Sequence, residues 1–182
     1  MKKMLLHSCC GPCSTHVIET LHPDYDITIF YYNPNILPEK EYILRENEQY
    51  RFLNLYKEKT GIDIGYIKGD YCPETFYNLT KGREAEKEGG QRCFDCIQHR
   101  LEVTSSMAQK EGFDIFCTTL SVSPHKNAQK INEMGNELSQ KYSIPYLISD
   151  FKKKNGYLHS IELSKEYELY RQSYCGCGFS SN

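Results

Sequence analysis

The chain has 182 residues, of which 39% are hydrophobic and 25% charged, and its formal net charge is −2 at pH 7. This balance excludes a protein that is basic throughout, and the length fits one domain whose core covers a sheet on both faces. No apolar run approaches the roughly 18 residues of a membrane span, and the first residues lack the long apolar stretch of an export signal. We therefore expect one domain, residues 1–182, that works in the cytoplasm without a membrane partner.

Runs of apolar or β-branched residues alternate along the chain with helical patterns that glycine or proline punctuates. In chain order we expect a strand at 4–7, a helix through 17–21, a strand at 26–32, a helix at 38–59, a strand at 64–67, a helix at 93–111, a strand at 115–118, a helix at 127–142, a strand at 146–148 and a helix at 160–171. The stretch before Gly89-Gly90 is poor in helical pattern. Alternating strands and helices predict right-handed crossovers and a parallel sheet of about five strands flanked by helices, a Rossmann-like α/β fold similar to the sheets of ATP pyrophosphatases.

The loops after four of these strands carry unusual residues. Because the carboxyl ends of parallel strands meet at one edge of a sheet, where ligands bind, we expect these loops to converge. The loops are Cys9-Cys10-Gly-Pro-Cys13, Asn33-Pro-Asn35, Ser121 to Lys126 and Asp150 to Lys154. The sequence therefore predicts one rim that gathers thiols, polar side chains and lysines.

The nine cysteines need an explanation other than disulfides, because cytoplasmic thiols are kept reduced. Seven of them fall in three tight groups: Cys9, Cys10 and Cys13; Cys93 and Cys96; Cys175 and Cys177. Cysteines placed by packing alone would not cluster in this way, so the grouping favours metal or redox chemistry. Cys72 and Cys117 stand alone and are interpreted as packing residues.

The first group lies where a strand meets a helix, and the amides and dipole of a helix start favour thiolates. Read alone, Cys10-Gly-Pro-Cys13 is the dithiol motif of thioredoxins. The context disfavours that interpretation, because the motif follows the first strand, Cys9 adds an adjacent thiol and the protein contains no tryptophan.

Cys93-Phe-Asp-Cys96 places two thiols three residues apart at a predicted helix start, which is half of a metal site. Cys9 and Cys10 from the facing loop would complete a set of four thiolates. Such a set suits a structural zinc ion as well as a 4Fe-4S cluster, and the spacing does not distinguish the two.

Cys175-Gly-Cys177 lies in the segment 172–182, which we expect to fold back over the rim as a tail. Two cysteines separated by one residue close only a small, strained ring when oxidised, and strained disulfides are the reactive ones. A redox-active pair or an open pair of metal ligands is therefore favoured over a structural crosslink.

Basic residues at the predicted rim allow two interpretations. Lys152, Lys153 and Lys154 in one loop, with His125 and Lys126 in another, either hold the phosphates of a nucleic acid or form a solvated face. The loop after the first strand lacks the glycine-rich pattern that binds phosphates, so an ATP-driven or NAD-dependent reaction is not expected.

Six segments, taken together, resemble a known family. They are LLHSCCGPC at 5–13, YNPNI at 32–36, GGQRCFDC at 89–96, TTLSVSPHKN at 118–127, DFKKK at 150–154 and YRQSYCGCGFS at 170–180. In this order, from Met4 to Ser180, they closely resemble the cobalamin-independent epoxyqueuosine reductases of the QueH type. The resemblance implies an enzyme that removes the epoxide oxygen of epoxyqueuosine in tRNA, the last step of queuosine synthesis.

The resemblance also implies roles for individual residues. The ligands of the family's 4Fe-4S cluster fall on Cys9, Cys10, Cys93 and Cys96, and its redox-active pair falls on Cys175 and Cys177. The family further implies a single iron beside the cluster, for which the candidate ligands are Cys13, Cys175, Cys177 and Asp70.

Deoxygenating an epoxide to an alkene consumes two electrons and two protons, whereas a 4Fe-4S cluster passes one electron at a time. We expect the cluster to supply one electron, and the Cys175/Cys177 dithiol or the second iron to supply the other. An unidentified donor would restore the enzyme. A neighbouring metal would bind the epoxide oxygen as a Lewis acid, and the candidate proton donors are Tyr32, His125 and a metal-bound water.

A modified base in an anticodon loop must be unstacked to react, so the site should stack on it and hold the adjoining phosphates. Candidate contacts to the tRNA are Tyr31, Tyr32, Asn33, Asn35, His125, Lys126, Lys152, Lys153 and Lys154. Two other classes stay open. A tRNA thiolase needs a phosphate loop where the first cysteine group stands, and a zinc-binding RNA module without catalysis would be colourless.

Overall fold

Four parallel strands form the centre of the structure, a computed structural model that describes residues 1–179. The strands are β1 (Lys2–His7), β2 (Tyr25–Tyr31), β3 (Gly65–Lys68) and β4 (Ile115–Thr118), in the spatial order β3-β2-β1-β4. The helices are α1 (Gly11–Leu21), α2 (Glu39–Thr60), α3 (Pro73–Thr80), α4 (Gln91–Lys110), α5 (Ala128–Tyr142) and α6 (Gly156–Glu166), and a 3-10 turn, η1, spans Leu120–Val122. This confirms the predicted parallel α/β fold.

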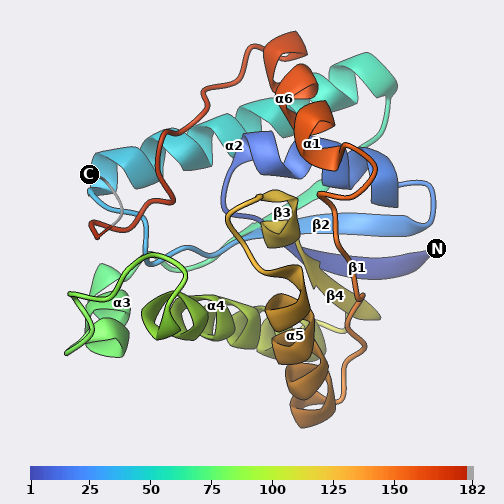
Figure 1. Cartoon of the computed structure of the whole chain (residues 1–182). Coiled ribbons are helices and arrows are strands. Elements are labelled where there is room, and N and C mark those ends of the chain that lie inside the picture. The colour runs from blue at the N-terminus through green and yellow to red at the C-terminus, as the bar shows by residue number, and fades with distance from the viewer. Residues whose placement is uncertain (180–182) are drawn as a thin grey trace.

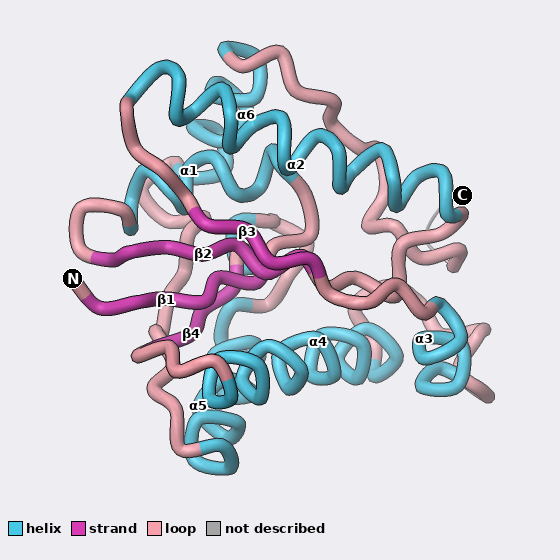
Figure 2. The backbone as a smooth tube through the Cα atoms, turned by 180° about the vertical axis from the view of Figure 1, so that it is seen from behind, coloured by secondary structure: helices cyan, strands magenta, loops and turns pink. Residues whose placement is uncertain are grey.

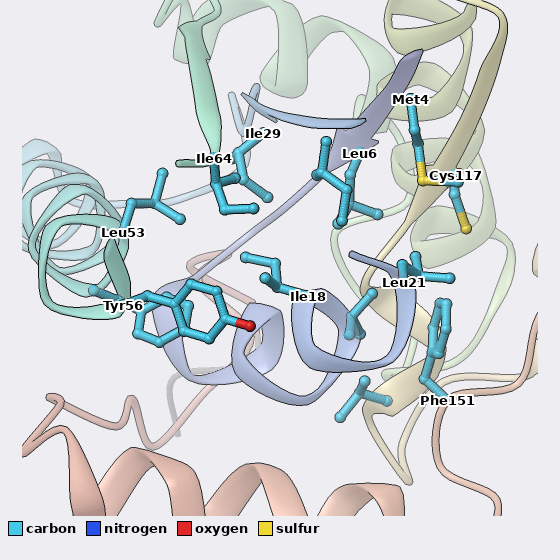
Figure 3. Packing of buried hydrophobic residues seen from close by; sticks show 14 of the residues in the cluster. Met4, Leu6, Ile18, Leu21, Ile29, Leu53, Tyr56, Ile64, Cys117 and Phe151 are labelled. Atoms are coloured by element: carbon cyan, nitrogen blue, oxygen red, sulfur yellow. The ribbon is translucent and has the colours of Figure 1, made fainter. Parts of the chain in front are cut away.

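Helices cover both faces of the sheet. Figures 1 and 2 show α1, α2 and α6 on one face and α4 and α5 on the other. The apolar residues of β1 alternate accordingly, because successive side chains of a strand point to opposite faces. Met4 and Leu6 pack with Ile18 of α1 (Figure 3), whereas Leu5 packs with Leu101 of α4. All five are fully or almost fully buried, so β1 lies at the middle of both halves of the core.

The prediction of a fifth strand at 146–148 is wrong. Tyr146 forms only an isolated parallel bridge with Phe116 of β4. That bridge consists of two backbone hydrogen bonds, from the Phe116 N–H to Pro145 O and from the Leu147 N–H to Phe116 O, both 3.0 Å long. Pro145 has no N–H to continue the ladder, which is the physical reason that a full strand does not form.

Two helices differ from the sequence-based expectation. The stretch before Gly89 contains α3, a short helix that begins with a proline and buries Phe76 and Thr80. The last helix, α6, begins four residues earlier than predicted and ends five residues earlier, at Glu166 rather than 171. Its end is a Schellman turn, because Glu168 has a φ of 53° and the Leu169 N–H donates to Ser164 O at 2.8 Å.

The early end of α6 releases the chain to form the tail. The segment that follows runs beside α2 toward the end of the molecule where α3 and α4 begin (Figures 1 and 2). Glu48 of α2 accepts a hydrogen bond of 2.8 Å from the Tyr170 N–H, which fixes this path. The last three residues of the predicted tail, 180–182, lie outside the described part of the chain.

No helix within residues 1–179 combines the length and the apolar character that crossing a membrane requires.

Candidate metal and redox site

The first cysteine group sits on the turn from β1 into α1, where the packing against α2 is close. A Cβ on Gly11 would lie 3.2 Å from Glu48 O, a tight contact, so the helix start closely approaches the α2 backbone. The Ser8 hydroxyl donates to the Gln49 side-chain oxygen at 2.6 Å. The turn is thereby held against α2, and it brings the sulfurs of Cys9, Cys10 and Cys13 within 4.8 Å of one another.

The second group lies on the first turns of α4. Cys93 and Cys96 are three residues apart and therefore face the same side of the helix. Cys96 is buried, and the half-buried Cys93 sulfur accepts a hydrogen bond of 3.3 Å from the Gly89 N–H. A backbone donor of this kind stabilises negative charge on a sulfur.

The third group reaches the site through the tail. The backbone of Gly176 has a φ of 122°, and a Cβ there would lie 2.9 Å from Ile36, so this position requires glycine. Gly176 O accepts a hydrogen bond of 2.8 Å from the Leu37 N–H. The sulfurs of Cys175 and Cys177, on either side, lie 3.4 Å apart, which is beyond the length of a disulfide bond.

Arg45 of α2 clamps the tail to the rest of the protein. Its two terminal nitrogens donate to Tyr174 O at 3.0 Å and to Cys175 O at 2.9 Å, and Glu41 balances its charge at 2.8 Å. Gln172 adds a contact from the tail to the first cysteine group, with its side-chain nitrogen 3.0 Å from the Cys10 sulfur.

The three groups meet at one cavity of about 340 Å³. Six thiols line it, from Cys9, Cys13, Cys93, Cys96, Cys175 and Cys177, and the Cys10 sulfur lies 3.9 Å from that of Cys9. Acidic and basic residues on the same wall are Glu88, Arg92, Arg100, His125, Lys126 and Arg171. Thiols from three distant segments thus share one concave site at the carboxyl edge of the sheet.

Electrostatics favour negative charge on one sulfur of the first group, Cys9, and disfavour it on Cys13, whose pKa is raised by hydrogen bonds with Cys10 and Cys9. Hydrogen bonds from Cys10 and Cys13 hold the pKa of Cys9 well below its usual value, whereas burial raises the pKa of Cys96. Burial acts to lower the pKa of the Arg100 guanidinium, but negative charge on Cys96 and Cys9 outweighs it and raises that pKa. The thiols and this buried arginine therefore stabilise each other's charged forms.

The donor set fits an iron-sulfur centre or another thiolate-bound metal. Soft thiolate ligands select zinc, copper or iron-sulfur clusters over magnesium or calcium.

Two buried amide oxygens from residues on the cavity wall, Oδ1 of Asn35 and Oε1 of Gln172, have no hydrogen-bond partner. Unsatisfied buried acceptors are costly, so these two oxygens indicate that the cavity binds a group with N–H or O–H hydrogen-bond donors.

Three of the predicted tRNA-contacting residues line the cavity: Asn35, His125 and Lys126. Asn33 is buried, and its side chain makes contacts within the protein: its amide nitrogen donates to Ser8 O at 2.9 Å and its oxygen lies 3.2 Å from the His7 ring. The Tyr32 hydroxyl pairs with His99 at 2.8 Å, away from the cavity wall. Tyr31 is fully buried.

The remaining predicted residues lie away from the cavity wall. Lys152 forms an ion pair of 3.0 Å with Asp150, and Lys153 lies in a shallow groove beside α5. Asp70 is exposed, as is Cys72. Cys117 is buried in β4, where burial raises its pKa to about 11.

Sequence reasoning missed several residues of the site. Arg100 follows Cys96 by one helical turn, a spacing that places it beside the thiols and that the sequence does contain. Arg45 has no comparable signal, because it is one charged residue among many on α2. Tyr157, Arg171 and Gln172 depend on the path of the tail and on where α6 begins.

The fold and the site define a class of protein: a parallel α/β protein with a cavity at the carboxyl edge of its sheet, lined by thiols that could hold a metal ion. The family model described as epoxyqueuosine reductase QueH matches residues 4–182. The chain belongs to this QueH family.

Similar proteins support that assignment. An epoxyqueuosine reductase QueH of Staphylococcus epidermidis is 45% identical over 98% of this chain and 76% of its own length. One of Thermotoga maritima is 36% identical over 99% of this chain and 91% of its own length. A crystal structure described as a predicted subunit of a tRNA methyltransferase from Methanocaldococcus jannaschii shares the fold, with a TM-score of 0.54 and 15% identity over 89% of this chain and 75% of that one.

Proposed function

We propose that this chain is an epoxyqueuosine reductase whose reaction takes place in the cysteine-lined cavity. The activity follows from membership of the QueH family, whose relatives carry that name over nearly the whole chain. The reaction is placed in this cavity because six thiols, from three segments far apart in the sequence, line it. Packing alone would not require this, because a buried structural cysteine is interchangeable with other small apolar residues.

Cys9, Cys10, Cys93 and Cys96 are the proposed ligands of a 4Fe-4S cluster. A cluster of this kind, when bound, supplies single electrons. The Gly89 N–H that points to the Cys93 sulfur would remain as a hydrogen bond to a ligand sulfur, a contact that tunes such centres.

Cys13 is the better placed of the candidate ligands for a second, single iron. Its sulfur lies within 4.8 Å of those of Cys9 and Cys10, and it lines the cavity. Asp70, the carboxylate candidate, is exposed and lies outside the cavity wall. Cys175 and Cys177 line the same wall and stay candidates for this role as well as for the redox pair.

The Cys175/Cys177 pair is the proposed source of reducing equivalents within the chain. Oxidation of a dithiol to a disulfide forms one S–S bond and releases two electrons and two protons. An epoxide takes up that same number when its oxygen leaves as water and an alkene remains. The two sulfurs lie 3.4 Å apart at the cavity wall, so a small movement brings them to bonding distance. An electron donor still to be identified would restore the dithiol.

Basic and aromatic side chains at the same cavity support a nucleotide substrate. The family name points to epoxyqueuosine, and we expect it as part of tRNA in the cytoplasm. Lys126 and Arg171 can hold phosphates, and the Arg171 guanidinium lies 6.0 Å from the centroid of the Tyr157 ring. His125, also on this wall, is placed to hold or move a proton during the reaction.

The test is conversion of epoxyqueuosine-containing tRNA, measured by mass analysis of the digested nucleosides under anaerobic conditions. Wild-type protein with a chemical reductant should form queuosine. Cys93→Ser should lose this activity together with its iron, whereas Cys72→Ser, an exposed cysteine outside the cavity, should retain both. Full activity in Cys93→Ser would show that the cavity thiols are not the site.

A further inference from the structure

Three buried arginines surround the thiols, and they differ in how their charge is balanced. Arg45, 1% exposed, forms an ion pair with Glu41. Arg92, 2% exposed, donates one terminal nitrogen to three backbone carbonyls at 2.6 to 3.1 Å and lies over the Phe179 ring. A carboxylate therefore balances the charge of Arg45, and three close carbonyl dipoles stabilise that of Arg92.

Arg100 is not compensated in this way. It is 3% exposed and lines the cavity, and its hydrogen bonds, to Cys96 O and to Oδ1 of Asn33, are both 3.4 Å long. No carboxylate of the described residues forms an ion pair with it. Glu88, the acidic residue on the cavity wall, is exposed.

A buried cation without an anion is strongly unfavourable, so negative charge must lie close by in the working protein. The groups at the cavity that supply it are the sulfurs. Arg100 follows Cys96 by one turn of α4, and it lines the cavity that Cys9 and Cys175 also line.

We propose that Arg100 is the residue that sets the reduction potential of the cysteine-bound centre, because its uncompensated buried charge stabilises the reduced, more negative state. The proposal rests on the proposed function, which places a 4Fe-4S cluster on Cys9, Cys10, Cys93 and Cys96. One-electron reduction of the cluster by an external chemical reductant adds one negative charge to the site. A fixed positive charge in a medium of low dielectric constant favours that product and raises the potential. In this proposal Arg100 acts on the cluster through its charge and takes no part in binding the substrate.

The test is an anaerobic titration of the cluster with dithionite in redox-mediator buffers, followed by electron paramagnetic resonance. Arg100→Gln should lower the midpoint potential by at least about 59 mV, a tenfold change in the one-electron equilibrium. Arg100→Lys keeps the charge and should stay close to wild type. Lys126→Gln removes a half-buried cation from the same cavity and serves as the matched control, with a smaller shift because water screens its charge.

A second variant neutralises Arg100 without removing it. Asn33→Asp places a carboxylate 3.4 Å from the guanidinium and should lower the potential in the same direction as Arg100→Gln. An unmoved potential in Arg100→Gln, or an equal fall in Arg100→Gln and Arg100→Lys, would overturn the proposal, because charge would then not be the cause.

Loss of the cluster is also informative. Loss from Arg100→Gln with retention in Arg100→Lys supports the proposal, since only the charge separates the two. Loss from both overturns it, since the requirement is then for the shape of the guanidinium. Iron and sulfide analysis of the wild type comes first. Wild-type protein without a cluster would contradict the proposed function, whereas a cluster whose potential does not change in Arg100→Gln would contradict the role of Arg100 alone.

Discussion

Cys10 and Cys13 belong to one short motif, yet their sulfurs have different surroundings. Cys10 is 1% exposed and is covered by the Gln172 side chain, whereas Cys13 is half-buried and lines the cavity. The sequence predicts that both thiols stand at the start of a helix, because the motif joins a strand to a helix. It does not predict which of them faces the cavity, because that depends on how the tail packs.

This difference gives a prediction for the two residues. Cys10→Ser should lose the 4Fe-4S cluster and its turnover, because the proposed ligand set is then incomplete. Cys13→Ser should keep the cluster spectrum but lose about one iron per chain, if this sulfur holds the second iron. Iron and sulfide analysis with visible spectroscopy measures both. A variant Cys13→Ser that loses all iron would make Cys13 a cluster ligand in place of Cys10.

At the scale of elements, the tail connects α6 to the cavity. Arg45 holds it by the carbonyls of Tyr174 and Cys175, and Glu48 holds its beginning by the Tyr170 N–H. The grouping of cysteines predicts that the tail takes part in the site. The two α2 residues that hold it could not be predicted, because nothing in a long polar helix distinguishes the charged residue that is buried from those that are solvated.

The tail cysteines should be separable from the cluster. Cys175→Ser and Cys177→Ser should each keep a normal cluster spectrum and lose most deoxygenation, since either change removes the dithiol. The sharper measurement is a single turnover without added reductant. A reduced wild-type enzyme holds enough electrons for one product, whereas a variant with the cluster alone does not. Equal yields from wild type and both variants would contradict a role for the pair.

The anchor at Glu48 should make tail docking depend on pH. Hydrogen bonds from Arg51, and also from the Tyr170 N–H, hold the pKa of Glu48 below its usual value. The stability that this carboxylate contributes is therefore fully present above its unfolded-state pKa and is lost as pH falls through its folded-state pKa. Glu48→Gln should lower the free energy of unfolding by about 1 kcal/mol at pH 7 and by nearly nothing in strong acid.

Urea unfolding at a series of pH values measures this effect. Glu58→Gln, an exposed change on the same helix, is the control and should leave the stability within about 0.5 kcal/mol of wild type. A loss in Glu48→Gln that is the same at neutral and acid pH would mean that packing, and not the charge, holds the tail.

At the scale of the whole molecule, the parallel α/β sheet follows from the alternation of strand and helix patterns in the sequence. What the sequence does not predict is set by contacts between distant residues. The segment at Tyr146 reads as a strand, but Pro145 limits it to one bridge, and α3 is too short for its pattern to stand out. The predicted rim is likewise divided, because the loop at 150–154 lies outside the cavity wall that the other three loops help to line.

That division changes what the lysines are expected to do. Lys153 and Lys154 are exposed, whereas Lys152 is paired with Asp150, so two charges rather than three are available to phosphates beyond the cavity. Neutralising all three should leave the cluster spectrum unchanged and make tRNA binding less dependent on salt. The slope of log K against log salt concentration should fall in magnitude by about 0.7 to 0.9 for each phosphate that the lysines neutralise. Lys110→Gln, at the far end of α4, is the control. An unchanged salt slope in the triple variant would assign these lysines to a solvated face.

The central claim is that the cavity thiols hold an iron-sulfur centre that reduces epoxyqueuosine, and one measurement on one sample tests it most directly. Protein purified without oxygen is analysed for iron, sulfide and zinc, and is then given epoxyqueuosine-containing tRNA and reductant. We predict brown protein with at least about four iron and four sulfide per chain, little zinc, and queuosine as product. Colourless protein with about one zinc per chain and no queuosine would contradict the account and favour a structural zinc site.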